Sequence, residues 1–87
     1  MPPAVDSARR RARAHLGRCL RLARTFAGDP SQASVGQQIR VDRGTLADWE
    51  AGESEPGGVN LIRLAEIYGV TLDALCGRTG LPVPPLP

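Results

Sequence analysis

The chain has 87 residues and a formal net charge of +2, and 41% of its residues are hydrophobic, with one Trp, one Tyr and one Phe. A chain of this length forms one small domain, in which a catalytic cleft is uncommon, and a core of Leu, Val, Ile and Ala favours packed helices over a β-sandwich. No run of about 18 apolar residues occurs, and no apolar stretch accompanies the N-terminal arginines. We therefore expect no membrane segment, no signal peptide and a cytoplasmic location.

The first predicted element is a long helix. Residues 1–7 contain two prolines and no periodicity, and we expect a flexible N-terminal tail there, ahead of a domain spanning residues 8–76. From Ser7 to Ala27 apolar residues recur at spacings of three and four, which predicts a helix that Gly28 ends.

A short second helix is expected from about residue 31 to residue 39. Its N-cap is either Asp29 or Ser31. In the first case Pro30 takes the first helical position and Gln32 completes a capping box. Gly36 is expected where this helix crosses the next one, because a small side chain lets two backbones approach.

The third predicted helix, residues 43–51, is capped by Asp42 and ended by Gly52. Its buried side carries Leu46 and Trp49 at a spacing of three. The residues that follow, GESEPGG, form a loop by composition.

A fourth helix is expected over about residues 58–68, and Thr71 caps a last short one that ends near residue 76. Leu72 and Leu75 on this last helix either meet a second copy of the chain or close the core. Residues 77–87 form a Pro-rich C-terminal tail whose PxxP spacing favours a polyproline helix, either as a disordered end or as a docking motif. No strand-like alternation occurs, so the expected fold class is all-α, with five short helices.

The order of these residues resembles a known family. The stretch SQASVGQQIRVDRGTLADWEAGESEP, followed by LIRLAEIYGVTLDAL, resembles the lambda-repressor-like helix-turn-helix proteins of the Xre or Cro type. LGRCLRLAR resembles the first helix of that family, so the resemblance covers roughly residues 16–76. It implies a compact five-helix DNA-binding domain with its helix-turn-helix at about residues 31–51, in which the third helix enters the major groove.

The resemblance also implies a set of contacts to double-stranded DNA, made by Gln32, Arg40, Arg43, Gly44, Thr45 and Asp48. Gln32 would touch phosphate and brace the third helix, and the last four would face base edges. Gly44 has no polar side chain, so base reading would depend on Arg43 for guanine, Thr45 for a thymine methyl and Asp48 for cytosine N4.

Arg40 stands where the family's turn usually has Gly. A left-handed backbone at a bulky residue costs roughly 1–2 kcal/mol, which a phosphate contact from the guanidinium would offset. The presumed DNA face has a net charge of −2, counting Arg40 and Arg43 against Asp42, Asp48, Glu53 and Glu55, with Glu50 expected to point into the fold.

The positive charge of the chain is concentrated elsewhere. Residues 1–28 hold seven arginines against Asp6 alone, a net +6, whereas residues 29–87 hold four arginines against eight acids, a net −4. The two parts therefore face different partners or each other. The run ARRRAR is interpreted either as a basic arm for DNA or as a solvated helix start, with four arginines at issue: Arg9, Arg10, Arg11 and Arg13.

No motif of an enzyme or a metal site is present. His15 is interpreted as a surface residue, and Cys19 and Cys76 as reduced core thiols, with a disulfide or a metal site as the alternative. No nucleophile elbow, phosphate-binding Gly loop or paired metal ligands occur, so we expect no enzyme, no metal and no cofactor.

Two functions follow from these features. The first is a sequence-specific transcriptional regulator that binds DNA as a repressor-like homodimer, because one small module buries too little surface to select a site well. The second is a degenerate helix-turn-helix scaffold that serves protein–protein interaction, in which the acidic third helix and loop meet a basic partner protein or the arginine arm of another copy.

Overall fold

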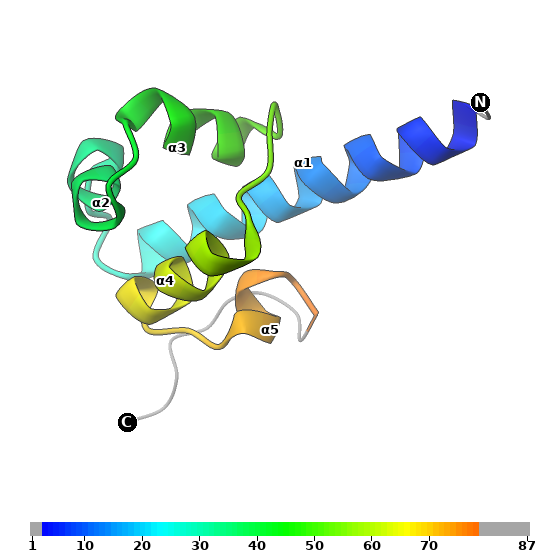
Figure 1. The fold of residues 1–87 in the computed structure, drawn as a ribbon. Helices are drawn as coiled ribbons and strands as arrows, with labels where there is room; N and C mark the ends of the chain where they lie inside the picture. The colour runs from blue at the N-terminus through cyan, green and yellow to red at the C-terminus, as the bar shows by residue number, and fades with distance from the viewer. Residues whose placement is uncertain (1–2, 79–87) are drawn as a thin grey trace.

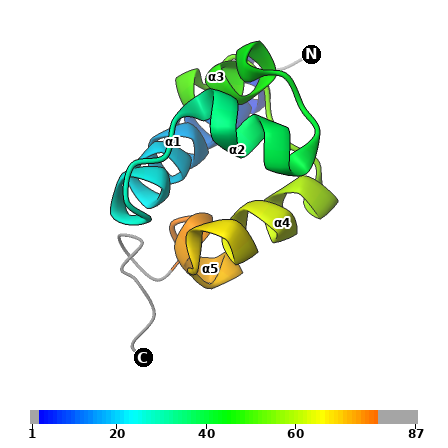
Figure 2. The same ribbon diagram turned by 90° about the vertical axis from the view of Figure 1, so that its left-hand side faces the viewer.

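The computed structural model describes the backbone of residues 3–78 and the side chains of residues 6–78. Within that range the chain forms α1 (Pro3–Phe26), α2 (Gln32–Ile39), α3 (Arg43–Ala51), α4 (Gly58–Tyr68) and α5 (Leu72–Leu75) and no strand, as the all-α prediction requires. The C-terminal half of α1 runs between two pairs of helices, α2 with α3 on one side and α4 with α5 on the other (Figures 1 and 2). Its N-terminal half projects beyond them (Figure 1).

The N-terminal boundaries of the short helices are set by side-chain caps. Asp42 accepts a hydrogen bond from the backbone N–H of Thr45, and Thr71 accepts one from that of Ala74, so both caps expected from the sequence are confirmed. Ser31 caps α2 by accepting from the N–H of Ser34. Asp29 instead has φ 56°, in the left-handed region, and is therefore not the cap.

The start of α1 differs from the prediction. The helix begins at Pro3 and not at Ser7, so the predicted start is wrong, while the flexibility expected of residues 1–7 stays a prediction. Proline suits the first turn of a helix because an N–H there has no intrahelical acceptor. The carboxylate of Asp6, also in the first turn, interacts favourably with the helix dipole. Residues 1–2 lie outside the described part of the chain, as do residues 79–87, most of the predicted Pro-rich tail.

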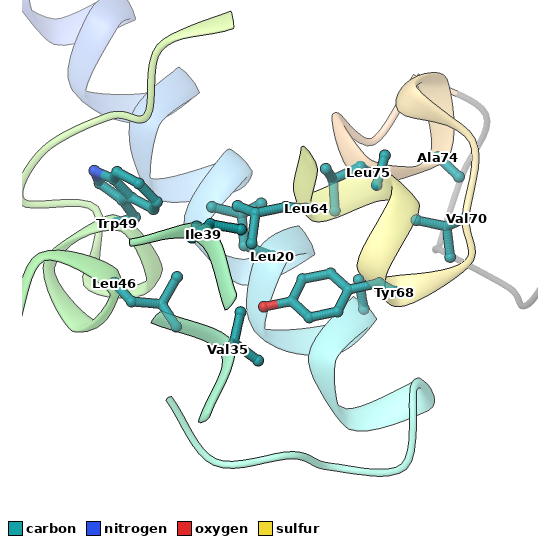
Figure 3. Packing of buried hydrophobic residues seen from close by; sticks show 12 residues of the cluster. Leu20, Val35, Ile39, Leu46, Trp49, Leu64, Tyr68, Val70, Ala74 and Leu75 are labelled. Carbon is teal, nitrogen blue, oxygen red and sulfur yellow. The ribbon is translucent and has the colours of Figure 1, made fainter. Parts of the chain in front are cut away.

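The core is built from all five helices (Figure 3). Leu20, Leu46, Leu64 and Leu75 are fully buried, and Trp49 is 5% exposed. Leu75 therefore closes the core of the single chain, whereas Leu72 is 43% exposed on the outer side of α5. The sequence did not distinguish these two leucines.

Two glycines allow backbones to approach closely. A Cβ at Gly36 would lie 2.6 Å from the carbonyl oxygen of Val41, so the small side chain expected there is required, by the turn that leads into α3. A Cβ at Gly17, for which the sequence analysis assigned no role, would lie 2.6 Å from the carbonyl oxygen of Glu50 and 2.7 Å from that of Trp49. Gly17 thus lets α1 pack directly on the backbone at the end of α3.

Both cysteines are free thiols, but only Cys19 is buried; Cys76 is half-buried, so the prediction of a core position is wrong for it. Burial raises the pKa of both thiols. The Sγ of Cys19 lies 3.7 Å from Nε2 of His15, whose side chain is exposed as expected. No group of three His, Cys, Asp or Glu side chains among residues 6–78 is arranged to hold a metal ion.

Candidate nucleic-acid interface

A buried ion pair fixes the position of α3. Arg24 on α1 donates from Nε to Oε2 of Glu50 at 2.7 Å and from Nη2 to Oε1 at 3.0 Å. The exposed fraction of the side chain is 12% for Arg24 and 4% for Glu50. Two parallel hydrogen bonds of this kind restrict orientation as well as distance, and they raise the pKa of Arg24. Glu50 points into the fold, as the sequence analysis expected.

Gln32 joins the same cluster from the first position of α2. Its Nε2 donates to Oε1 of Glu50 at 3.0 Å. The expected brace between Gln32 and the third helix is therefore present, and it acts through Glu50. We call Arg24, Gln32 and Glu50 the junction cluster, since it joins α1, α2 and α3.

The turn between α2 and α3 has the backbone that the sequence analysis expected at Arg40. This residue adopts φ 60° and ψ 45°, the left-handed region, where a bulky side chain costs roughly 1–2 kcal/mol. The N–H of Val41 donates to the carbonyl of Gly36 at 2.9 Å, which satisfies one of the last acceptors of α2. The side chain of Arg40 is exposed, and a phosphate contact by it stays a prediction.

Arg63 supports the same helix end from α4, a role that the sequence did not reveal. Its guanidinium donates to the carbonyl oxygens of Ile39 at 3.0 Å and Gln38 at 3.1 Å. These carbonyls belong to the last turn of α2 and have no partner within that helix. An arginine 24 positions away from Ile39 carries no local signal of such a contact.

The outer face of α3 presents the residues expected to read bases. Arg43, Gly44 and Asp48 are exposed, and Thr45 is half-buried. The hydroxyl of Thr45 donates to Oδ1 of Asp42 at 3.3 Å, so its methyl group is the part left for an outside contact. A Cβ at Gly44 would meet only Oδ1 of Asp42, at 3.6 Å, so the fold itself does not require glycine at this position.

A hollow of about 570 Å³ lies between α1, the start of α2 and α3, and Arg21 and Arg43 line it together with the junction cluster. Neither arginine forms an ion pair within residues 6–78, whereas Arg24 and Glu50 neutralise each other. The hollow therefore carries an excess of positive charge beside Gln32. No signal in the sequence predicted that Arg21 lies beside the same hollow as Arg43.

The arginines of the ARRRAR run lie within α1, and a contact of this run with DNA stays a prediction. Arg9 donates from Nη2 to Oε1 of Glu55 at 2.9 Å, and Arg13 from Nε to the carbonyl oxygen of Gly52 at 3.1 Å. Both contacts reach the loop of residues 52–57 after α3. Arg10 and Arg11 are exposed and form no hydrogen bond or ion pair with the described side chains. Basic and acidic parts of the chain thus partly face each other.

No helix within residues 3–78 combines the length and apolar character that a membrane span requires. Searches of curated proteins and of solved structures found no match. Residues 20–75 match the family model described as helix-turn-helix, and this region contains α2–α5, the junction cluster and the whole outer face of α3. The chain therefore belongs to the lambda-repressor-like helix-turn-helix family, a family of DNA-binding proteins and not of enzymes.

Proposed function

We propose that the protein is a sequence-specific transcriptional regulator that acts in the cytoplasm as a repressor-like homodimer and places α3 in the major groove. The observation that carries this proposal is the way α3 is held. Leu46 and Trp49 are buried, Glu50 is tied to α1 and α2, and the side that bears Arg43 is exposed. A helix fixed on its inner side and free on its outer side is what recognition in the major groove requires.

Base reading would depend on few side chains. Arg43 can form two parallel hydrogen bonds with guanine, and Asp48 can accept from cytosine N4. The methyl group of Thr45 suits a thymine methyl, because the hydroxyl is engaged by Asp42. Gly44 leaves room for the backbone of α3 to come close to the bases.

Phosphate contacts would come from the flanks of α3. An amide nitrogen has two hydrogens, so Gln32 can hold Glu50 with one and a phosphate with the other. Arg40 in the turn would supply a second contact. Arg10 and Arg11 on the projecting half of α1 would add further contacts that do not depend on sequence.

The homodimer follows from the size of the domain. A single small module buries too little surface to select a site well, and two copies would bind half-sites about 34–36 Å apart. Leu72 is 43% exposed on α5 and is an apolar side chain available to a second copy. Control would come from blocking a promoter or from contact with polymerase.

Selection from a pool of random duplex DNA tests this proposal. The full chain is incubated with the pool, bound duplexes are sequenced, and affinity for the enriched sequence is measured at several salt concentrations. A motif with two-fold symmetry and a steep salt dependence is expected. Feeble binding without any enriched motif would contradict the proposal.

A protein-interaction module is the second candidate, and the charge of the face favours it. Asp48, four residues after Gly44 on α3, is exposed, and so is Glu53 in the loop after α3, where phosphates would be near. Such a face suits a basic partner protein. In this case the DNA selection yields no motif, and replacement of Arg43 by Ala leaves the feeble DNA binding unchanged.

A further inference from the structure

The hollow between α1 and α3 carries a positive charge that the proposed function leaves without a role. Arg21 and Arg43 line this hollow, together with Gln32 at the start of α2. Arg43 is assigned to base reading, so the charge in question is that of Arg21. The side chain of Arg21 is exposed and forms no ion pair with the described residues 6–78.

The neighbouring arginine of the hollow is already occupied. Arg24 donates to Glu50 from Nε and Nη2. Its Nη1 donates to the carbonyl oxygen of Pro30 at 2.9 Å and lies 3.5 Å from Oδ1 of Asp29. All three nitrogens of this guanidinium are therefore engaged within the fold, and its side chain is only 12% exposed. An anion in the hollow would have to be held by Arg21.

The position of the hollow indicates which anion it meets. When the second helix of a helix-turn-helix lies in the major groove, the helix before it lies across the DNA backbone. The hollow lies between these two helices, because its lining includes the start of α2 and the side of α3 that bears Arg43 and Ala47. A backbone phosphate at the edge of the major groove would therefore face it.

The charge around α3 favours the same place. The lining of the hollow contains three arginines and one acid, Glu50, a net charge of +2. The face predicted from the helix-turn-helix and its loop has a net charge of −2. A phosphate that approaches α3 is thus attracted toward the hollow and repelled by the acidic side chains around it.

We propose that the hollow binds one backbone phosphate in each DNA half-site and that Arg21 is its principal donor. This inference rests on the proposed function. A guanidinium can form two parallel hydrogen bonds with a phosphate, and the second amide hydrogen of Gln32 can reach the same group. Arg21 is then a DNA-binding residue supplied by α1, outside the helix-turn-helix itself.

Binding of the selected DNA by variants of the full chain tests the proposal. Arg21→Gln should weaken binding to matched and mismatched duplexes alike, by about tenfold, and should lower the salt slope by about 1 without changing the preferred sequence. Arg21→Lys should recover part of the loss. Arg18→Gln is the matched control, because Arg18 is exposed on the same helix but does not line the hollow. It should leave affinity nearly unchanged, and thermal unfolding should be alike in all three variants.

Single methylphosphonate replacements locate the contact, because each removes the charge of one phosphate. In the wild type, replacement at one position of each half-site should weaken binding by about tenfold. The same replacement should cost Arg21→Gln much less, since the two changes remove the same interaction. Equal losses in both proteins at every phosphate would overturn the proposal.

The remaining outcomes separate this inference from the proposed function. An enriched motif that Arg21→Gln and Arg18→Gln bind equally well would overturn this inference alone. Absence of any enriched motif with the wild type would overturn the proposed function and this inference together. Saturation of the hollow by micromolar inorganic phosphate without DNA, followed in the side-chain resonances of Arg21, would overturn it in favour of a free phosphate ligand.

Discussion

Two sets of arginine contacts link α1 to the end of α3, and they differ in burial. In the junction cluster, Arg24 and Glu50 are 12% and 4% exposed and share two hydrogen bonds. Near the start of α1, Arg9 and Glu55 are 67% and 42% exposed and share one. The chemical groups are the same, but water screens the second pair and is excluded from the first. We therefore expect the junction cluster to hold α3 in place and the Arg9 contact to add little to stability.

Removing Glu50 should have the largest effect. Glu50→Ala breaks the buried pair and leaves Arg24 with only the exposed carboxylate of Asp29 at 3.5 Å and the carbonyl oxygen of Pro30 at 2.9 Å. Removing one partner of a buried pair typically costs about 3–5 kcal/mol in the free energy of unfolding. Urea denaturation followed by circular dichroism measures this loss. The double variant Arg24→Met with Glu50→Leu should recover much of it, since no charge is then left buried. A single variant as stable as the wild type would show that the junction cluster does not hold the fold.

Enlarging Gly17 should separate the helices at the same junction. Gly17→Ala places a Cβ 2.6 Å from the backbone oxygen of Glu50, and overpacking of this kind costs about 1–3 kcal/mol. The matched control is Gly44→Ala on the outer face, which should raise stability by about 0.5–1 kcal/mol because alanine favours helix over glycine. Equal stability of the two variants would contradict the close approach at Gly17.

The variant Arg43→Ala tests whether the exposed face of α3 contacts DNA bases. The fold should keep its stability, while affinity for the selected DNA falls by about 1–3 kcal/mol and preference relaxes at one base pair. Arg10→Ala and Arg11→Ala serve as charge-matched controls, and each should weaken binding to all sequences alike and lower the salt slope by about 1. Titration of matched and mismatched duplexes measures both effects. Unchanged preference in Arg43→Ala would remove this residue from base reading.

A substitution at Tyr68 tests whether water is excluded from the region near the junction cluster. Its hydroxyl is buried without a hydrogen-bond partner in the described structure, and burial raises the pKa of this hydroxyl, with a further rise from the charge of Glu50. In Figure 3 the ring reaches from α4 toward Val35. Tyr68→Phe should be neutral or stabilise the fold by up to about 1 kcal/mol, because an unpaired buried polar group is unfavourable. A clear loss of stability in thermal unfolding would indicate a partner for the hydroxyl.

The smallest effect is expected at Arg9. Arg9→Ala removes an exposed ion pair, and such pairs contribute about 0–1 kcal/mol at most. The loss of stability in Arg9→Ala should vanish at high salt, whereas the loss in Glu50→Ala should persist. Chemical denaturation in low and high salt distinguishes the two, and a large salt-independent loss in Arg9→Ala would make the two contacts equivalent.

Local sequence signals predicted most of the helix boundaries. Asp42 and Thr71 cap the helices that follow them, and Gly52 ends α3, as expected. Gly69 ends α4 in the same way, with a left-handed backbone. Each of these signals acts within about four residues, so neighbouring residues suffice to interpret it. The choice between Asp29 and Ser31 was left open, because both offer an oxygen and only the backbone angles separate them.

The helical pattern, the family and the residues on the outer face of α3 follow from the amino-acid sequence alone, because periodicity, caps and motif order are local. The partners of the arginines, in contrast, follow from the folded arrangement of the helices. Arg24 meets Glu50 26 positions later and Arg9 meets Glu55 46 positions later, and no local spacing encodes such pairs. The need for glycine at position 17 and the support of α2 by Arg63 likewise arise where distant segments touch. The contribution of each contact to stability depends on how deeply the contact is buried, and burial exists only once the chain has folded.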